Sequence, residues 1–219
     1  GLMTEKRLEK KFIFQIGDRY VDYFLINGFF KKIFETRIIN SIYLDNFDLK
    51  NIWDNINGFS TRTKYRVRWY NDINNSKVFF EEKHKSNQIT MKQKYELGIF
   101  KDENSLIKFL DSEQFIKDIT YKYQCNLNKI LKVSYKRSYF IEPQKKIRVT
   151  FDENIFVNKN YKRKNMGIWL ENNILELKYK LKDSNFCNEL VKNSKLNQRN
   201  KKYSKYIQSF IDINESGLV

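Results

Sequence analysis

Lysine and arginine residues recur at every second position in several stretches of this chain. Lys64, Arg66 and Arg68 form the clearest example, because apolar or aromatic residues stand between them. Side chains that alternate with a period of two lie on opposite faces of a β-strand. One face of this strand would carry cations, which donate charged hydrogen bonds to phosphate oxygens. The pattern therefore predicts a phosphate-binding strand.

Other stretches of the chain repeat this alternation. Basic residues on the predicted polar faces are Arg7, Lys11, Lys83, Lys85, Lys92, Lys94, Arg137, Arg148 and Lys178. Acidic residues on the same faces are Glu9, Glu81, Glu96, Asp152 and Glu176. These carboxylates could pair with the bases or bind a divalent metal through their oxygens. A single strand of this kind is most often the solvated face of a sheet, whereas a series of them indicates a shared charged surface. His84 falls on the opposite face, which predicts a packed or surface histidine rather than a catalytic base.

The elements that would position these faces indicate an α+β fold. Strands are predicted over residues 7–14, 39–45, 62–69, 80–85, 91–96, 133–141, 146–152 and 175–180, and helices over 18–27, 49–56, 105–123, 184–195 and 203–211. Sheets with many strands tend to close or stack. We therefore predict a closed antiparallel β-barrel with flanking helices, formed by residues 1–219 as a single domain. Its charged faces would line a water-filled, positive tunnel, and repulsion among those charges implies an anionic ligand.

The composition agrees with a polyanionic ligand and excludes several other chemistries. The 219 residues include 42 Lys and Arg against 26 Asp and Glu, which gives a formal net charge of +16. The glycine-rich motifs of P-loop and dinucleotide-binding proteins are absent, so side chains must hold any phosphate. The two cysteines predict buried thiols in a reducing compartment, and the sequence shows no signal peptide or membrane-spanning segment. We expect a cytoplasmic protein.

The motifs, taken in order along the chain, resemble a known family. They are Arg7-x-Glu9-x-Lys11, Ser41 to Asp45, Lys64-x-Arg66-x-Arg68, Glu81-x-Lys83, Lys92, Tyr135-Lys136-Arg137, Ile147 to Asp152, Leu175 to Lys178 and Lys202 to Ile207. This series resembles the VTC domain, the polyphosphate polymerase module of the vacuolar transporter chaperone, within the triphosphate tunnel metalloenzymes. The resemblance implies transfer of the ATP γ-phosphoryl group to a growing inorganic polyphosphate chain.

The resemblance also implies roles for individual residues. A catalytic set that contacts the phosphates would be Lys11, Arg66, Arg68, Lys83, Lys92, Arg137 and Arg148. A second set that binds phosphate or nucleotide would be Arg7, Lys64, Lys85, Lys94, Lys178, Ser204 and Lys205. Glu176 would bind the metal, Mn²⁺ or Mg²⁺. The expected partners are ATP and inorganic polyphosphate, and no specific nucleic acid is expected. A membrane or regulatory partner is compatible with the resemblance.

Two alternative functions use the same residues. One is a metal-dependent triphosphatase or polyphosphatase, in which water replaces the phosphate chain as acceptor. Many members of the wider superfamily carry an acid where this chain has Arg7, and the loss of a metal ligand there favours the polymerase. The other alternative is a polyanion binder without catalytic activity. Its aromatic residues, however, lie on the faces opposite the bases, which does not suit the stacking of single-stranded nucleic acid.

Overall fold

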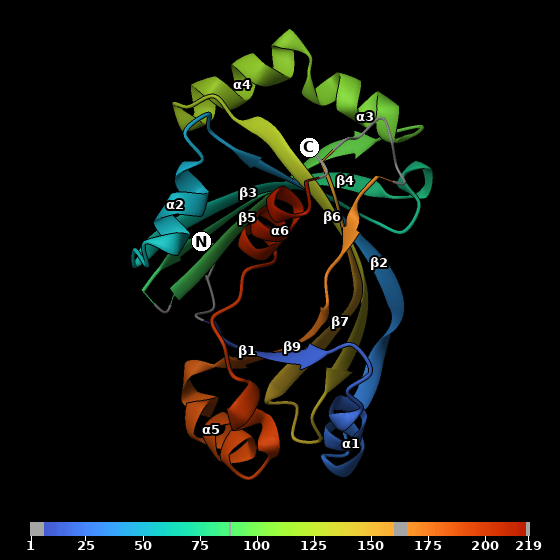
Figure 1. Cartoon of the computed structure of the whole chain (residues 1–219), viewed down its shortest axis with the longest axis vertical. Coiled ribbons are helices and arrows are strands. Elements are labelled where there is room, and N and C mark those ends of the chain that lie inside the picture. The colour runs from blue at the N-terminus through green and yellow to red at the C-terminus, as the bar shows by residue number, and fades with distance from the viewer. Residues whose placement is uncertain (1–6, 88, 160–165, 218–219) are drawn as a thin grey trace.

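The structure is a computed structural model that describes residues 7–87, 89–159 and 166–217 (Figure 1). Within these residues the chain forms nine strands and six helices, which confirms an α+β fold. The strands are β1 (Arg7–Gln15), β2 (Lys31–Asp45), β3 (Thr61–Tyr70), β4 (Lys77–Ser86), β5 (Ile89–Ile99), β6 (Asn128–Ile141), β7 (Ile147–Asn158), β8 (Ile168–Trp169) and β9 (Asn172–Lys180). The helices are α1 (Tyr20–Asn27), α2 (Lys50–Ile56), α3 (Glu103–Leu110), α4 (Glu113–Tyr123), α5 (Ser184–Lys192) and α6 (Lys205–Glu215).

The strands form one antiparallel sheet in the order β1-β9-β7-β6-β2-β3-β4-β5, with β8 paired to β7. The prediction of a closed barrel is wrong, because within the described residues β1 and β5 remain the two edges. The segment that leads into α6 already occupies part of the β1 edge: Asn200 bridges to Phe12, and the Lys201 amide donates to the Lys11 carbonyl at 3.3 Å. Those backbone groups of β1 are therefore unavailable to β5.

Helices cover both faces of the sheet. On the convex side, α1 and α5 pack on β1, β7 and β9, and α3 and α4 pack on the strands from β2 to β5. The C-terminal helix α6 lies inside the curve of the sheet (Figure 1), where it packs with residues of β2, β6, β7 and β9 in a separate apolar cluster. The concave face is thus apolar where α6 covers it and charged beyond the helix.

The buried carboxylate of Asp45 fixes α6 against the sheet. Tyr206 of α6 stacks on Tyr43 of β2, with ring centroids 4.8 Å apart, and its hydroxyl donates to Asp45 Oδ2 at 3.0 Å. Asp45 also accepts hydrogen bonds from the amides of Asn51 and Ile52 at the start of α2. One side chain at the end of β2 therefore holds two helices.

The structure differs from the predicted elements at a few places. The helix predicted over 105–123 is two helices, because Ser112 starts α4 by accepting a hydrogen bond from the Phe115 amide. In β7 the register against β6 shifts, and Asn154 there has a φ of 51°, so the residues beyond it change faces. None of the helices in the described part of the chain is long and apolar enough to cross a membrane.

The two cysteines and the histidine largely follow their predictions. Both cysteines are free thiols, with Cys187 buried as predicted and Cys125 only partly buried. His84 packs on the convex side, where its Nδ1 lies 3.0 Å from the Thr63 hydroxyl. The histidine therefore faces away from the charged surface.

Candidate active site

Three lysines lie directly opposite one another on adjacent strands of the concave face. Lys64 of β3 is in register with Lys83 of β4, which is in register with Lys92 of β5. Side chains opposite each other in an antiparallel sheet have Cβ atoms only about 5 Å apart, and like charges in such positions are destabilising. A row of three lysines therefore favours an anion between or above them.

Next to this row, one buried carboxylate serves three cations. Glu81 of β4 is only 1% exposed, and its oxygens lie 2.7 Å from Arg66 Nε, 2.7 Å from Lys92 Nζ and 3.8 Å from Arg68 Nη1. Burial acts to raise the pKa of Glu81, but these cations, Arg66 foremost, lower it to about 2. Glu81 is therefore ionised at neutral pH and holds the guanidinium groups in place.

Arg68 is further fixed by two hydroxyl groups. It donates to Ser41 Oγ at 2.9 Å and to the Tyr135 hydroxyl at 3.1 Å. The side chain is almost completely buried, so Arg68 reaches the concave face as a rigid cation.

A second buried carboxylate, Asp152 of β7, joins the sheet to α6. Arg137 of β6 donates two hydrogen bonds to it, at 2.6 and 2.8 Å, and Lys205 of α6 lies 2.5 Å from its Oδ2. Burial acts to raise the pKa of Asp152, but Arg137 and Lys205 lower it to about 2. The predicted site residues Arg137 and Lys205 are therefore brought together by an acid from a third element.

Lys11 and Lys64 differ from the other cations, because within the described residues neither has a carboxylate at ion-pair distance. Lys11 donates to the Tyr203 carbonyl at 2.8 Å and Lys64 donates to Ser204 Oγ at 2.6 Å. Burial lowers the pKa of Lys11 to about 8, and burial together with the Lys11 charge lowers that of Lys64 well below its usual value. An anion at this position would favour the charged form of both lysines.

Two further carboxylates lie on β1 and β9. Glu9 lies 3.1 Å from Lys83 of β4, across the opening of the sheet, and Glu176 lies 3.4 Å from Lys178. Burial acts to raise the pKa of both carboxyl groups, but the lysines around them lower it. Glu9 and Glu176 also repel each other electrostatically, so their charges lie near one another.

These two carboxylates are the candidate metal ligands. Within the described residues no three acidic, histidine or cysteine side chains form a metal-binding group. A magnesium-like ion is commonly held by one or two carboxylates together with the phosphates of the substrate. Glu176 and Glu9 fit that kind of site, in which the ligand completes the coordination.

The remaining predicted residues lie toward the rims of the charged surface. Lys94 lies over the Phe79 ring at 3.6 Å, and Lys85 is half-buried opposite Arg62. Arg148 is exposed, and its side chain lies on the same face of β7 as that of Asp152. Arg7 is exposed at the start of β1. The structure thus places the predicted residues on one concave face, and their roles stay predictions.

Two residues on this face are not among the site residues predicted from the sequence. Arg37 packs between the rings of Tyr70 and Tyr139, 4.4 and 5.0 Å from their centroids, and Tyr135 accepts the hydrogen bond from Arg68. Register shifts around Phe34 disrupt the alternation before Arg37, so no period-two signal marks it. Tyr135 precedes Arg137 by two residues on β6, so the same period-two pattern could have placed it on the charged face.

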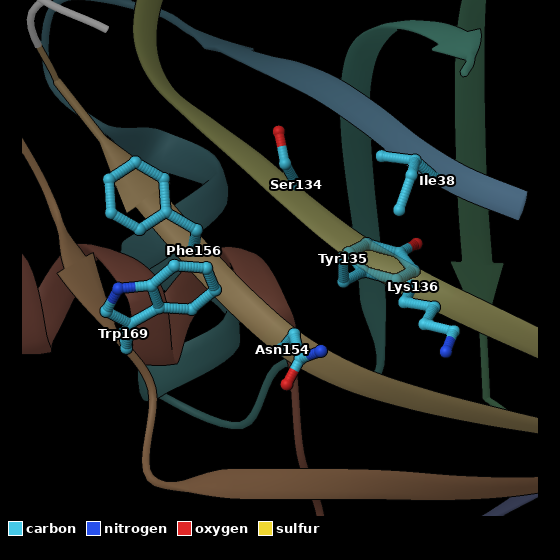
Figure 2. A pocket seen from close by; sticks show the side chains of 7 residues that line it. All are labelled: Ile38, Ser134, Tyr135, Lys136, Asn154, Phe156 and Trp169. Atoms are coloured by element: carbon cyan, nitrogen blue, oxygen red, sulfur yellow. The ribbon is translucent and has the colours of Figure 1, made fainter. Parts of the chain in front are cut away.

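A cavity of about 570 Å³ lies on the opposite face of the sheet (Figure 2). Phe156 and Trp169 stand on one side of it and Ile38 and Lys136 on the other. Ser134 and Lys136 alternate with Tyr135 and Arg137, so this convex cavity is separated from the cations by the sheet itself. It provides a surface for control substitutions.

Residues 14–212 match the family model of the VTC domain. The chain belongs to the VTC domain family. This confirms the resemblance seen in the motifs, although the matched range of this VTC domain begins after Arg7, Glu9 and Lys11. No curated protein matches the chain.

Solved structures share the fold of this VTC domain. A putative adenylate cyclase from Bacillus halodurans has 15% identity and a TM-score of 0.55, over 94% of this chain and 97% of that one. The PH1819 protein from Pyrococcus horikoshii has 14% identity and a TM-score of 0.53, over 94% and 98%. A putative adenylyl cyclase from Hippeastrum with a dominant triphosphatase activity has 10% identity and a TM-score of 0.52, over 95% of each chain. The VTC domain therefore shares the fold of these solved structures.

Proposed function

We propose that this chain, acting over residues 1–219 as one VTC domain, transfers the γ-phosphoryl group of ATP to a growing inorganic polyphosphate chain. The observation that carries the proposal is the row of Lys64, Lys83 and Lys92 in direct register, because a fold tolerates such a row where an anion of high charge density binds. Adjacent guanidinium groups extend the row, so a chain of phosphates rather than one phosphate matches it.

The residues of the concave face supply what phosphoryl transfer requires. The reaction needs positioning of the phosphates and neutralisation of the charge on their oxygens, with little covalent help from the protein. Glu81 and Asp152 hold Arg66, Arg68 and Arg137 in fixed positions before substrate arrives. A preorganised cation stabilises developing charge without rearranging during the reaction.

A divalent metal is part of the proposal. Glu176, with Glu9 beside it, would hold Mn²⁺ or Mg²⁺, and the bound ion would neutralise part of the phosphate charge. Lys178 lies 3.4 Å from Glu176, and it would turn from that carboxylate toward a phosphate when the carboxylate is engaged. Lys11, in register with Glu176 on β1, would bind the same phosphate chain from the neighbouring strand.

Hydrolysis of triphosphates or short polyphosphates is the second candidate. The sheet is open between β1 and β5, and the Lys92 side chain is 41% exposed, so water reaches the charged face. Arg7 at the position where an acid would add a metal ligand favours the polymerase.

The test is incubation of the purified protein with ATP and Mn²⁺, with products resolved on a gel before and after exopolyphosphatase treatment. We expect a ladder of exopolyphosphatase-sensitive chains and a matching amount of ADP. Arg66→Ala and Arg148→Ala should each lower the rate by about 10²-fold or more, the usual effect of removing a group that stabilises transition-state charge. Lys136→Ala, on the convex face, is the matched control.

Each other outcome selects a different function. Orthophosphate without chain growth would identify the hydrolase, and binding without turnover would identify a polyanion binder. Full activity of both arginine variants would contradict the assignment of the concave face as the active site.

A further inference from the structure

Aromatic rings, rather than carboxylates, hold Arg37 on the concave face. Its guanidinium lies 4.4 Å from the centroid of Tyr70 and 5.0 Å from that of Tyr139, and its Nη2 donates to the Tyr139 hydroxyl at 2.9 Å. Its Nε is buried and has no hydrogen-bond partner among the described residues. A ring attracts a cation more weakly than a carboxylate does. The positive charge of Arg37 therefore stays available to an anion.

Lys94 of β5 lies against the same aromatic group. Its Nζ is 5.9 Å from the centroid of Tyr70 and 3.6 Å from that of Phe79. The Lys94 side chain is exposed, so an anion can reach it from solvent. Because Arg37 and Lys94 both contact Tyr70, the two cations form one cluster around a single ring.

This cluster continues the series of cations on the neighbouring strands. Tyr70 follows Arg68 by two residues on β3, so both side chains lie on the concave face. Arg37 of β2 is in register with Arg137 of β6. Like charges directly opposite each other in an antiparallel sheet are destabilising. As in the lysine row, this pairing favours an anion at the same place.

The distance along β3 decides which anions reach the cluster. Tyr70 comes six residues after Lys64 on this strand, and at about 3.3 Å per residue this corresponds to about 20 Å. Three linked phosphates are much shorter than this. A tripolyphosphate bound at the lysine row therefore ends before Arg37, whereas a longer chain extends to it.

The C-terminal helix decides in which direction a longer chain can extend. Tyr206 of α6 donates to Asp45, the last residue of β2, and Leu131 near the start of β6 belongs to the apolar cluster of the helix. The helix thus occupies the end of the concave face where β2 ends and β6 begins. Arg37 lies in the first half of β2, away from this end. A long chain would therefore leave the face past Arg37.

We propose that Arg37, together with Lys94, binds the part of a polyphosphate chain that extends beyond the phosphates at the lysine row. This rests on the proposed function, because it assigns a place to the acceptor of the same reaction. Arg37 is thus a specificity-determining residue. It favours a long phosphate chain over tripolyphosphate, which presents the same charged groups but does not reach it.

The experiment compares two ligands by isothermal titration calorimetry at constant ionic strength: inorganic tripolyphosphate and long-chain inorganic polyphosphate, with concentrations counted in chains. Arg37→Gln and Lys94→Gln should each weaken binding of the long chain about 10-fold, equivalent to about 1.4 kcal/mol. Tripolyphosphate binding should change by less than about 2-fold, because salt screens charges that are separated by more than about 8–10 Å. Lys94 is exposed, so Lys94→Gln is expected to fold normally.

Arg62→Gln is the matched control. Arg62 precedes Lys64 by two residues on β3 and is therefore a cation at the other end of the strand from Tyr70. Its charge acts on Lys64, whose pKa it helps to lower. The substitution should therefore affect both ligands by the same factor and leave the ratio of the two affinities unchanged.

Two results would overturn the inference. One is an unchanged ratio of the two affinities in both Arg37→Gln and Lys94→Gln, and the other is a selective loss of long-chain binding in Arg62→Gln. Because the readout is binding, it stays separate from the proposed function. A protein that makes no polyphosphate can still prefer the long chain through Arg37, and an active polymerase can still fail this test.

Discussion

The charged side chains of the concave face divide into two kinds. Most of the cations are held by carboxylates, such as the three that share Glu81. Lys11 and Lys64 instead donate to a backbone carbonyl and to a serine hydroxyl. A neutral acceptor compensates a buried ammonium group less well than a carboxylate does. These two lysines are therefore the ones whose charge state depends most on the arrival of an anion.

This difference predicts a pH dependence of tripolyphosphate binding. The pKa of Lys11 in the free protein is about 8, so the side chain is charged below that pH and neutral above it. The affinity for tripolyphosphate should fall as pH rises from 7 to 9, as measured by calorimetry. Lys11→Arg should reduce this dependence, because an arginine stays charged throughout. A part of it should remain, because burial also lowers the pKa of Lys92 to about 8. An equally steep loss in the variant would contradict the role of Lys11.

At the scale of elements, the placement of α6 decides the shape of the site. The helix covers the apolar part of the concave face and brings Ser204 and Lys205 to the cations. Its position depends on an apolar interface and on Tyr206, whose hydroxyl donates to Asp45. The hydroxyl of Tyr203, just before the helix, is also buried but has no hydrogen-bond partner among the described residues.

The two tyrosines provide a matched pair of substitutions. Tyr206→Phe should lower the free energy of unfolding by about 1.5–3 kcal/mol, because it removes a hydrogen bond to a buried carboxylate. Tyr203→Phe removes a hydroxyl that lacks a partner, so it should be neutral or slightly stabilising. Urea denaturation of both variants measures the difference. Equal destabilisation by the two would show that the hydrogen bond to Asp45 does not hold α6.

At the scale of the whole molecule, the sheet is curved but open. The segment Asn200–Lys201 pairs with the edge strand β1, and the ion pair between Glu9 and Lys83 joins β1 to β4 across the opening. Partly exposed ion pairs contribute little to stability, typically about 0–1 kcal/mol. A phosphate chain bound to Lys11 on one side of the opening and to Lys64 and Lys92 on the other would add bonds across it. Binding should therefore stabilise the molecule as a whole.

Thermal unfolding tests this expectation. Tripolyphosphate at 100 times its Kd should add about 2.7 kcal/mol to the free energy of unfolding, which for a chain of this size raises Tm by about 5–10 °C. The increase should shrink as salt rises, because salt screens the interaction of exposed charges. Lys136→Ala should retain the full increase. A similar rise with sulfate at the same ionic strength would indicate non-specific anion binding instead.

The sequence by itself determined which side chains share the charged face. Alternation is a local property of a strand, so Lys64, Arg66 and Arg68 had to point the same way wherever β3 was placed. For the same reason the acids Glu81 and Asp152 could be assigned to the faces of the cations. The ordered motifs added the family, which the match over residues 14–212 confirms.

Only the tertiary structure decided how these faces meet. Which acid holds which cation, as Asp152 does for Arg137 and Lys205, depends on contacts between residues far apart in the chain. The free edge of β1 is partly occupied by Asn200 rather than by β5, and no local pattern in the sequence encodes this contact. The register shifts before Arg37 and beside Asn154 likewise change the face on which the following side chains lie. The alternation in the sequence does not reveal either shift. Local periodicity fixes the direction of a side chain, whereas its partners depend on the packing of the whole chain.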